Sequence, residues 1–212
     1  MRDLFRLTWI LLPLALGSCG LIGDDQNEED KLEIITFVDD NFKTFCLKNY
    51  DTNSDGKLSV YEARFARNMD CSGLDIQDMS EINYFDLLIT LDCSNNDLTE
   101  LTPTKCLNLT SIDCSENRKL TNLDLENLSL LASLKCNSNS LYRLSFVQKG
   151  SLSKIECSDN KLSILDLSDC ATTIDILNTR HNSELSTIYL TQLQSDNIKM
   201  VNIDGHTKLS IR

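Results

Sequence analysis

The stretch "LDCSNNDL", from Leu91 to Leu98, returns along the chain in slightly altered form. "IDCSENRKL", "LKCNSNSL" and "IECSDNKL" follow it, and the cysteines of successive copies lie 21 or 22 residues apart. Self-similarity at a fixed period of about 20 to 50 residues is typical of repeat architectures, in which each repeat is one structural unit. The repeated phrase therefore decides the fold class of this 212-residue chain.

The frame of the repeat reads L-x-x-L-x-C-x-x-N-x-L-x-x-L. Apolar and polar residues alternate around the cysteine, and this alternation predicts a short strand with one buried face. A single repeat cannot bury such a face alone, so we expect successive repeats to stack as coils. Copies of the frame begin at Leu88, Leu109, Leu131, Leu152, Ile174 and Ile198, and a degenerate leading copy holds Met69, Cys71, Ile76 and Met79.

The cysteine of the frame is expected to be a small core residue. Thr179 and Ile203 take its place in the fifth and sixth copies, and isoleucine fits neither a disulfide nor a metal site. Disulfides between coils are an alternative, because adjacent coils lie about 4.8 Å apart. However, five side chains in phase cannot all form pairs. Zinc is disfavoured because the chain has no Cys-x-x-Cys spacing.

A second small core position follows the last leucine of the frame by five residues. Cys106 and Cys170 occupy it in two copies, and Leu128 and Leu193 occupy it in two others. Since free cysteine behaves as a small buried hydrophobe, all four are expected to point into the core.

This frame resembles that of the leucine-rich-repeat family in its short bacterial type, over about residues 69–212. The resemblance implies an α/β fold, a curved solenoid with one short parallel strand per coil on its concave face. The asparagine of the frame offers two donors and an acceptor to the turn after each strand, which is a structural role. This ladder consists of Asn96, Asn117, Asn139, Asn160 and Asn182, and His206 stands at the same position in the sixth copy.

"DTNSDGKLSVYE", from Asp51 to Glu62, precedes the repeats and resembles the loop of an EF-hand. Oxygen donors at alternating positions suit Ca²⁺, a glycine at the sixth position permits the sharp turn, and a glutamate at the twelfth can bind through both oxygens. The predicted ligands are Asp51, Asn53, Asp55, Lys57 through its carbonyl, Ser59 and Glu62. The alternative is a polar turn and helix cap without a metal, because Ser59 and Glu62 also form a capping-box pattern.

The first residues are typical of a targeting segment. Arg2 and Arg6 precede the apolar run "LTWILLPLAL", which is too short for a membrane span. "LGSC", ending at Cys19, resembles the lipobox of bacterial lipoproteins and implies that Cys19 is lipidated. The acidic stretch behind it resembles the surface-export signals of lipoproteins in the Bacteroides group. We therefore expect an outward-facing anchor in the outer membrane, the alternative being an ordinary secretory signal.

The chain is thus expected to have four segments: a signal peptide (1–18), an acidic tether (19–31), a helix-loop-helix EF-hand-like cap (32–68) and the solenoid (69–212). A net charge of -12 argues against a nucleic-acid partner. No sequence motif of an enzyme is present, so we expect a protein- or peptide-binding module rather than a catalyst. A glycan-binding lipoprotein of a nutrient-uptake system and a structural spacer of the envelope are the alternatives.

The outward side chains of the predicted strands are the candidate binding residues. They are acidic in the first two copies and mixed in charge further along, so a polar or basic polypeptide is expected to meet Asp92 and Asp113 first. The predicted partner-binding set is Asp92, Asp113, Lys135, Lys154, Glu156 and Arg180. The C-terminal end of the solenoid is a rival site, where two copies of the chain could pair.

Overall fold

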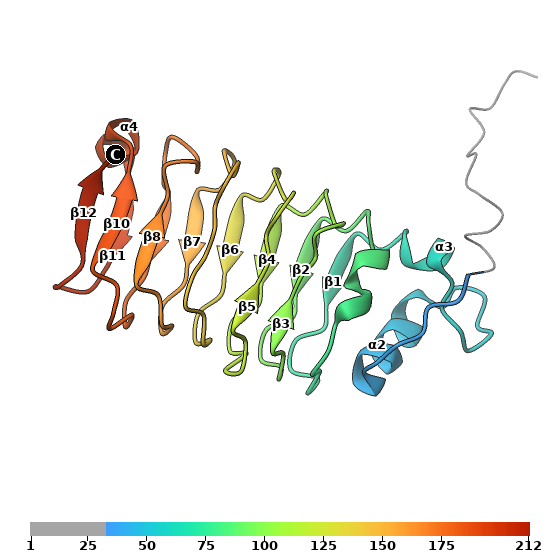
Figure 1. The fold of residues 1–212 in the computed structure, drawn as a ribbon. Helices are drawn as coiled ribbons and strands as arrows, with labels where there is room; N and C mark the ends of the chain where they lie inside the picture. Colours follow the sequence, from blue (N-terminus) through green and yellow to red (C-terminus); the bar gives the residue numbers. More distant parts are fainter. Residues whose placement is uncertain (1–32) are drawn as a thin grey trace, which may run out of the picture.

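A computed structural model describes residues 33–212 of the chain. The predicted signal peptide, Cys19 and the acidic tether lie outside the described residues. Figure 1 shows the described part as a single row of stacked coils, with helical segments at the N-terminal end. Within residues 33–212, no helix is long and apolar enough to cross a membrane.

The predicted solenoid is confirmed. One strand from each coil joins a seven-stranded parallel sheet in the order β1-β2-β4-β6-β7-β9-β11. The strands are β1 (Asn68–Asp70), β2 (Thr90–Asp92), β4 (Ser111–Asp113), β6 (Ser133–Lys135), β7 (Lys154–Glu156), β9 (Ile176–Asn178) and β11 (Met200–Asn202). The middle residue of each strand except β11 is buried in the core, as the alternation of the frame predicts. Successive middle residues are register partners, for example Leu91 with Ile112 and Ile112 with Leu134.

The structure also contains strands that the sequence analysis did not predict. A second set of short strands lies on other sides of the coils and forms a two-stranded and a three-stranded parallel sheet. They are β3 (Glu100–Leu101), β5 (Asn122–Leu123), β8 (Ile164–Asp166), β10 (Thr187–Leu190) and β12 (Lys208–Ile211). In β8 and β10, side chains alternate between exposed and buried positions, so these segments follow the same strand rule as the first set.

All eight cysteines of the described residues are free and buried. Each is excluded from water, and burial raises the pKa of the thiol, to about 12 in the case of Cys157. Thr179 is equally buried in the fifth coil, which agrees with the core position predicted from the substitutions.

One prediction for the second core position is wrong. Leu193 is 53% exposed, and the amide of Gln194, 1% exposed, lies inside instead.

The asparagine ladder is confirmed over the five predicted coils. Asn139 is representative: its Nδ2 donates to the carbonyls of Cys114 and Cys136, at 3.1 and 3.0 Å. Its Oδ1 accepts from the backbone N–H of Asn117 at 2.8 Å. The ladder therefore satisfies backbone groups in the turn that the strand ladder leaves without partners.

The sixth coil departs from the prediction for His206. Its side chain is exposed and takes no part in the ladder. Instead, Asp204 Oδ2 accepts from the backbone N–H of Asn182 at 3.1 Å. An acidic side chain two residues earlier thus replaces the expected imidazole, because a carboxylate oxygen can accept the bond that an amide oxygen accepts elsewhere.

The N-terminal segment packs against the leading coil. Helix α2 (Asp40–Tyr50) is followed by the loop 51–59, the single-turn helix α3 (Val60–Ala63) and, after β1, the 3-10 helix η1 (Ser80–Tyr84). Phe42 of α2 is fully buried and its ring centroid lies 6.2 Å from that of Phe85, which follows η1. Asp39 caps α2 with Oδ1 and accepts from the backbone N–H of Gln77 with Oδ2, at 2.8 Å. These contacts cover the apolar end of the first coil.

The C-terminal end is less covered. The remaining short helix, α4 (Gln192–Asn197), lies before β11. Val201 and Leu209, which occupy frame positions that are buried in the central coils, are each 39% exposed, and Ile211 is 49% exposed.

Candidate functional site

The outward side chains of the seven-stranded sheet form the first candidate site, which we call the sheet face. Parallel register places equivalent residues of neighbouring coils side by side: Asp70 beside Asp92, and Asp92 beside Asp113. Neighbouring strands lie about 4.8 Å apart, so the three carboxylates form a row along the solenoid. The row changes charge at Lys135, the register partner of Asp113.

Each aspartate of this row is oriented by its own turn. Asp70 Oδ1 accepts from the backbone N–H and the hydroxyl of Ser72, at 3.2 and 2.8 Å. Asp92 accepts from both groups of Ser94 in the same way, at 3.0 and 2.6 Å. In the third coil the backbone N–H of Ser115 donates to Asp113 at 3.1 Å. One oxygen of each carboxylate is thus used locally, and the orientation of the side chain is fixed without a counter-charge.

Cationic partners are scarce along this row. Lys135 Nζ lies 3.7 Å from Asp113 Oδ2. Among residues 33–212, neither Asp70 nor Asp92 has an ion-pair partner. A hollow of about 330 Å³ lies over this part of the sheet, and Asp70, Asp92, Asp113 and Lys135 line it. Like charges on neighbouring strands repel one another, so this hollow favours a cationic guest.

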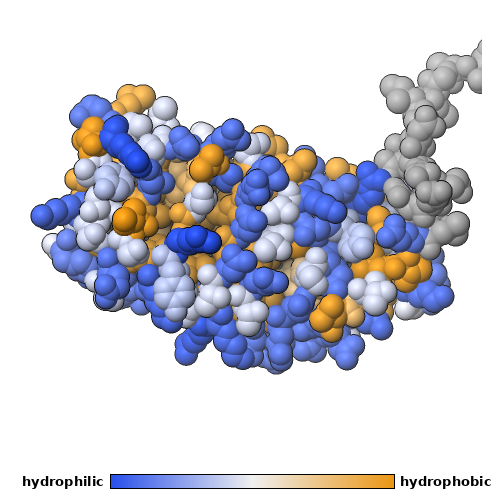
Figure 2. Space-filling view, viewed as in Figure 1, coloured by the Kyte–Doolittle hydropathy of each residue, from blue (hydrophilic) through white to orange (hydrophobic). Residues whose placement is uncertain are grey.

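The structure divides the predicted partner-binding set. Asp92, Asp113 and Lys135 meet in the hollow, whereas Lys154, Glu156 and Arg180 do not line it. The sequence analysis missed Asp70. The sequence does contain a pattern that identifies Asp70, since "DCS" at Asp70–Ser72 repeats the "DCS" of the next two coils. Figure 2 shows hydrophilic side chains over most of the visible surface, with apolar patches between them.

The loop from Asp51 to Glu62 is the second candidate site. Asp51 Oδ2 accepts from the backbone N–H of Gly56 at 2.9 Å, and Asn53 Oδ1 accepts from that of Asp55 at 2.9 Å. Gly56 has φ 77°, a conformation that glycine adopts without strain. The predicted turn at this glycine is therefore present.

Glu62 occupies the centre of this segment and is 6% exposed. Its Oε2 accepts from the hydroxyl of Ser59 at 2.7 Å, and its Oε1 accepts from the backbone N–H of Thr52 at 3.0 Å. Burial opposes ionisation, but the hydrogen bonds from Ser59 and Thr52 outweigh it and lower the pKa of the Glu62 carboxyl. Glu62 is thus held as a carboxylate that joins the start of the loop to α3.

The donor set of the loop suits a hard cation, because it consists of carboxylate, amide, hydroxyl and carbonyl oxygens. Within residues 33–212, however, no group of three or more acidic, histidine or cysteine side chains converges as metal ligands do. An isolated antiparallel bridge between Ile34 and Ser59 ties the loop to the preceding segment, and the backbone N–H of Ile35 donates to the carbonyl of Leu58 at 2.8 Å. Leu58 itself is buried, with 1% exposure.

Comparison with known proteins gives weak likenesses only. No family model matches the sequence, and no curated protein is similar to it. Three structures from Listeria monocytogenes align with 82% of this chain. The structure of internalin C2 is 16% identical to this chain, with 87% of its own chain covered and a TM-score of 0.48. The functional domain of InlJ, described as including a cysteine ladder, gives 18% identity and a TM-score of 0.38.

The third structure, the internalin InlF, gives 15% identity with 69% of its chain covered and a TM-score of 0.41. This chain spans about half, 54%, of the InlJ domain. At such identities a likeness concerns the fold alone, so the function has to be argued from the residues of this chain.

Proposed function

We propose that this chain is a surface-anchored leucine-rich-repeat module that binds a protein or peptide on its sheet face, with basic side chains of the ligand against Asp92 and Asp113. The observation that carries the proposal is the row of three carboxylates, of which only Asp113 has a cationic partner within residues 33–212. A cationic ligand would relieve the repulsion between neighbouring aspartates, whereas an anionic ligand would increase it.

The chemistry of the sheet face also bears on the alternatives. None of the outward side chains of the seven described strands in this sheet is aromatic. Aromatic rings commonly stack against sugars, so the face offers little to a glycan. Without aromatic anchors the expected affinity for a polypeptide is also modest, and charge complementarity acts mainly on the rate of association. A purely structural spacer would bind no ligand at all.

A fluorescent hexalysine peptide tests the proposal, with hexaglutamate as the control peptide. We expect hexalysine to bind at low salt and to lose affinity as salt is raised, because exposed charges are screened. The double variant Asp92→Lys with Asp113→Lys should abolish this binding. The control variant, Glu100→Lys with Glu184→Lys, makes the same change of net charge at exposed residues away from the sheet face and should retain it. Undiminished binding after the Asp92 and Asp113 reversal would refute the proposal.

The proposal includes a structural Ca²⁺ in the loop 51–62, held by Asp51, Asn53, Asp55, the carbonyl of Lys57, Ser59 and Glu62. When bound, the ion would neutralise three carboxylates and clamp α2 and α3 together. The oxygen-only donor set supports this role, and so does the backbone hydrogen bond between Ile35 and Leu58, which steadies the loop without a second EF-hand. The affinity is expected in the weak range of extracellular modules, about 10⁻⁴–10⁻³ M.

Thermal melting tests the calcium site. About 10 mM Ca²⁺ should raise the Tm by roughly 3–6 °C, since a bound ligand stabilises only the folded state. Asp55→Asn and Glu62→Gln should remove this shift, whereas Glu126→Gln, at an exposed residue elsewhere, should keep it. An unchanged Tm of the wild-type protein in calcium would eliminate the site.

Anchoring through a lipid on Cys19 is the remaining part of the proposal, supported by the lipobox pattern "LGSC". The expected location is the outer membrane, facing outward. Cys19→Ala should leave the protein unprocessed or release it from the membrane fraction. Protease treatment of whole cells tests the orientation, and complete protection of the wild-type protein would exclude surface exposure.

Contact between two copies at the C-terminal end is supported by the exposed Leu209 and Ile211. Sedimentation velocity of the full chain should then show a dimer that Ile211→Lys dissociates. A monomer at all accessible concentrations would contradict this contact.

A further inference from the structure

A groove of about 520 Å³ separates α2 from the leading coil. Thr44, Phe45 and Lys48 line it from the helix, and Asp70, Ser72 and Leu74 line it from the coil. Two hydrogen bonds link the helix to the coil and fix the distance between them. Asn41 Nδ2 donates to the carbonyl of Asp75 at 3.1 Å, and the Tyr50 hydroxyl donates to the carbonyl of Asn68 at 3.2 Å. The groove is therefore a built feature of the fold.

The groove is lined by both apolar and charged side chains. Leu74 is 39% exposed although it is a large hydrophobic residue, and Phe45 is half-buried. Lys48 contributes a positive charge on the helix side, which disfavours a second cation inside the groove. An apolar side chain of a partner suits this environment better than a basic one.

The groove is continuous with the sheet face, because Asp70 lines both the groove and the hollow over the aspartate row. Asp70 and Asp92 are register partners, and so are Asp92 and Asp113. A ligand that places cations along the aspartates therefore reaches the groove at the N-terminal end of the same row.

We propose that the groove receives a bulky apolar side chain of the same extended polypeptide whose basic side chains meet Asp92 and Asp113. This proposal rests on the proposed function and specifies its ligand: basic residues next to a bulky apolar residue. In an extended chain, side chains on one face are about 6.6 Å apart, and neighbouring coils are about 4.8 Å apart. A segment of roughly five residues, with alternate side chains facing the solenoid, spans the row from Asp113 to the groove.

Three synthetic peptides test whether the ligand needs a bulky apolar residue next to its basic residues. The first, Gly-Lys-Gly-Lys-Gly-Phe-Gly, carries the apolar residue after the lysines, and the second carries the same residues in reverse order. The third replaces phenylalanine with glycine. Fluorescence anisotropy with the full chain should show that one of the phenylalanine peptides binds about tenfold more tightly than the glycine peptide, because burying an aromatic side chain adds to the electrostatic attraction.

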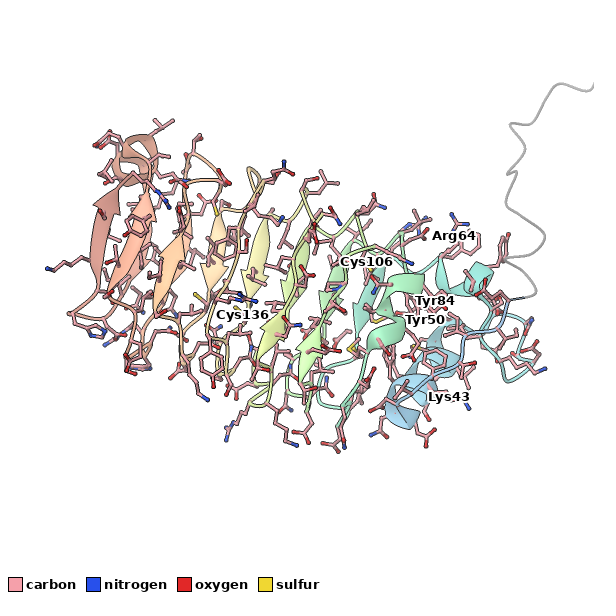
Figure 3. All side chains as sticks on the ribbon, in the orientation of Figure 1. Lys43, Tyr50, Arg64, Tyr84, Cys106 and Cys136 are labelled. Carbon is pink, nitrogen blue, oxygen red and sulfur yellow. The ribbon has the colours of Figure 1, made fainter. Side chains whose placement is uncertain are left out.

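Variants on α2 locate the effect. Thr44→Trp fills the groove and should remove the tenfold preference while leaving the affinity for the glycine peptide unchanged. Lys43→Trp is the matched control, because Lys43 is exposed and projects from the side of α2 away from the coils (Figure 3). Leu74→Ser, in an exposed turn, removes an apolar wall and should act as Thr44→Trp does. Melting curves establish that each variant is folded.

The outcomes separate the two proposals. Equal affinity of all three peptides for the wild-type protein, or a preference that survives both Thr44→Trp and Leu74→Ser, overturns the groove proposal. In either case, loss of binding in the Asp92→Lys and Asp113→Lys double variant leaves the sheet-face function standing. If none of these three peptides binds the wild-type protein, the groove proposal is overturned, and the sheet-face function falls with it only if hexalysine does not bind either.

Discussion

The central coils and the final coil follow the same sequence frame but differ in what the frame achieves. In the central coils the middle residues of the strands are buried, as Leu134 is at 0% exposure. In the final coil the equivalent Val201 is 39% exposed. Leu134 has register partners on both sides, Ile112 and Ile155, whereas Val201 has only Leu177 among residues 33–212. The frame therefore sets the direction of a side chain, and the neighbouring coils set its burial.

The difference extends to the chemistry of the core. Four central coils carry a buried thiol in the frame position, and the final coil carries the partly buried Ile203. Above about pH 8.5 a thiol exposed by unfolding ionises, whereas a thiol shielded from water between stacked coils keeps its proton. Conditions that ionise thiols should therefore act on the central coils far more strongly than on the final one.

The largest expected effect is unfolding in alkali. Burial raises the pKa of all eight described thiols, and the four with a pKa of about 12 are Cys71, Cys106, Cys157 and Cys170. Unfolded thiols titrate near pH 8.5, so above this pH the unfolded chain releases protons that the folded chain retains. The free energy of unfolding then falls by up to about 1.4 kcal/mol per thiol for each pH unit, and the contribution is fully present below about pH 8.

With eight thiols the loss approaches about 11 kcal/mol per pH unit, which is comparable to the whole stability of a typical domain. Far-UV circular dichroism under reducing conditions should therefore show unfolding within about one to two units above pH 9. Cys136→Val should make this dependence shallower by about one eighth. A protein that keeps its Tm at pH 10.5 would show that the thiols are accessible to water in the folded state.

The next effect concerns the strand core. Leu134→Ala should lower the free energy of unfolding by about 3–4 kcal/mol, because the cavity forms between two packed coils. Val201→Ala should cost less than about 1 kcal/mol, since its side chain is already partly exposed. Urea denaturation of the two variants measures the difference. Equal losses would mean that the final coil is covered in solution, for example by a second copy of the chain.

The fold was predictable to the extent that coils repeat. Six copies of the frame act as an internal alignment, so the strand positions, the core cysteines and the asparagine ladder followed from the sequence. The second strands did not, because β3 and β5 have only two residues each and give no alternating pattern. The error at Leu193 has a similar cause. The helix α4 interrupts the frame there, and Gln194 becomes buried because its Nε2 donates to the carbonyl of Leu167 at 2.6 Å.

The candidate site was predictable only in part. Alternation in the strands identified Asp92 and Asp113 as outward side chains, and the hollow over the sheet contains both. Asp70 escaped attention because the leading copy is degenerate. The groove beside α2 could not be predicted at all, since it depends on how a helix outside the repeat packs on the first coil. Repeats thus predict the sites that they form themselves, but not the sites at their junction with other elements.

The third effect compares an asparagine of the ladder, Asn139, with His206, which stands at the same frame position in the final coil. Asn139→Ala should cost about 1–3 kcal/mol, because it leaves the backbone N–H of Asn117 without its partner and removes one of the two asparagine donors to each of the carbonyls of Cys114 and Cys136. His206→Ala should change the stability by less than about 0.5 kcal/mol, as expected for an exposed side chain. Chemical denaturation again gives the comparison. A large loss for His206→Ala would restore the role that the frame predicts for this position.

The smallest effect has the opposite sign and concerns two buried threonines. Thr179 is fully buried where the preceding coils carry cysteine, and its Oγ1 has no hydrogen-bond partner within residues 33–212. Valine has nearly the same shape without the hydroxyl, so Thr179→Val should stabilise the protein by about 1 kcal/mol. Thr207 of the final coil is the matched control, because its Oγ1 donates to the carbonyl of Leu185 at 2.7 Å. Thr207→Val should therefore destabilise by about 1 kcal/mol, and a loss of stability in both variants would show that the Thr179 hydroxyl has a partner in solution.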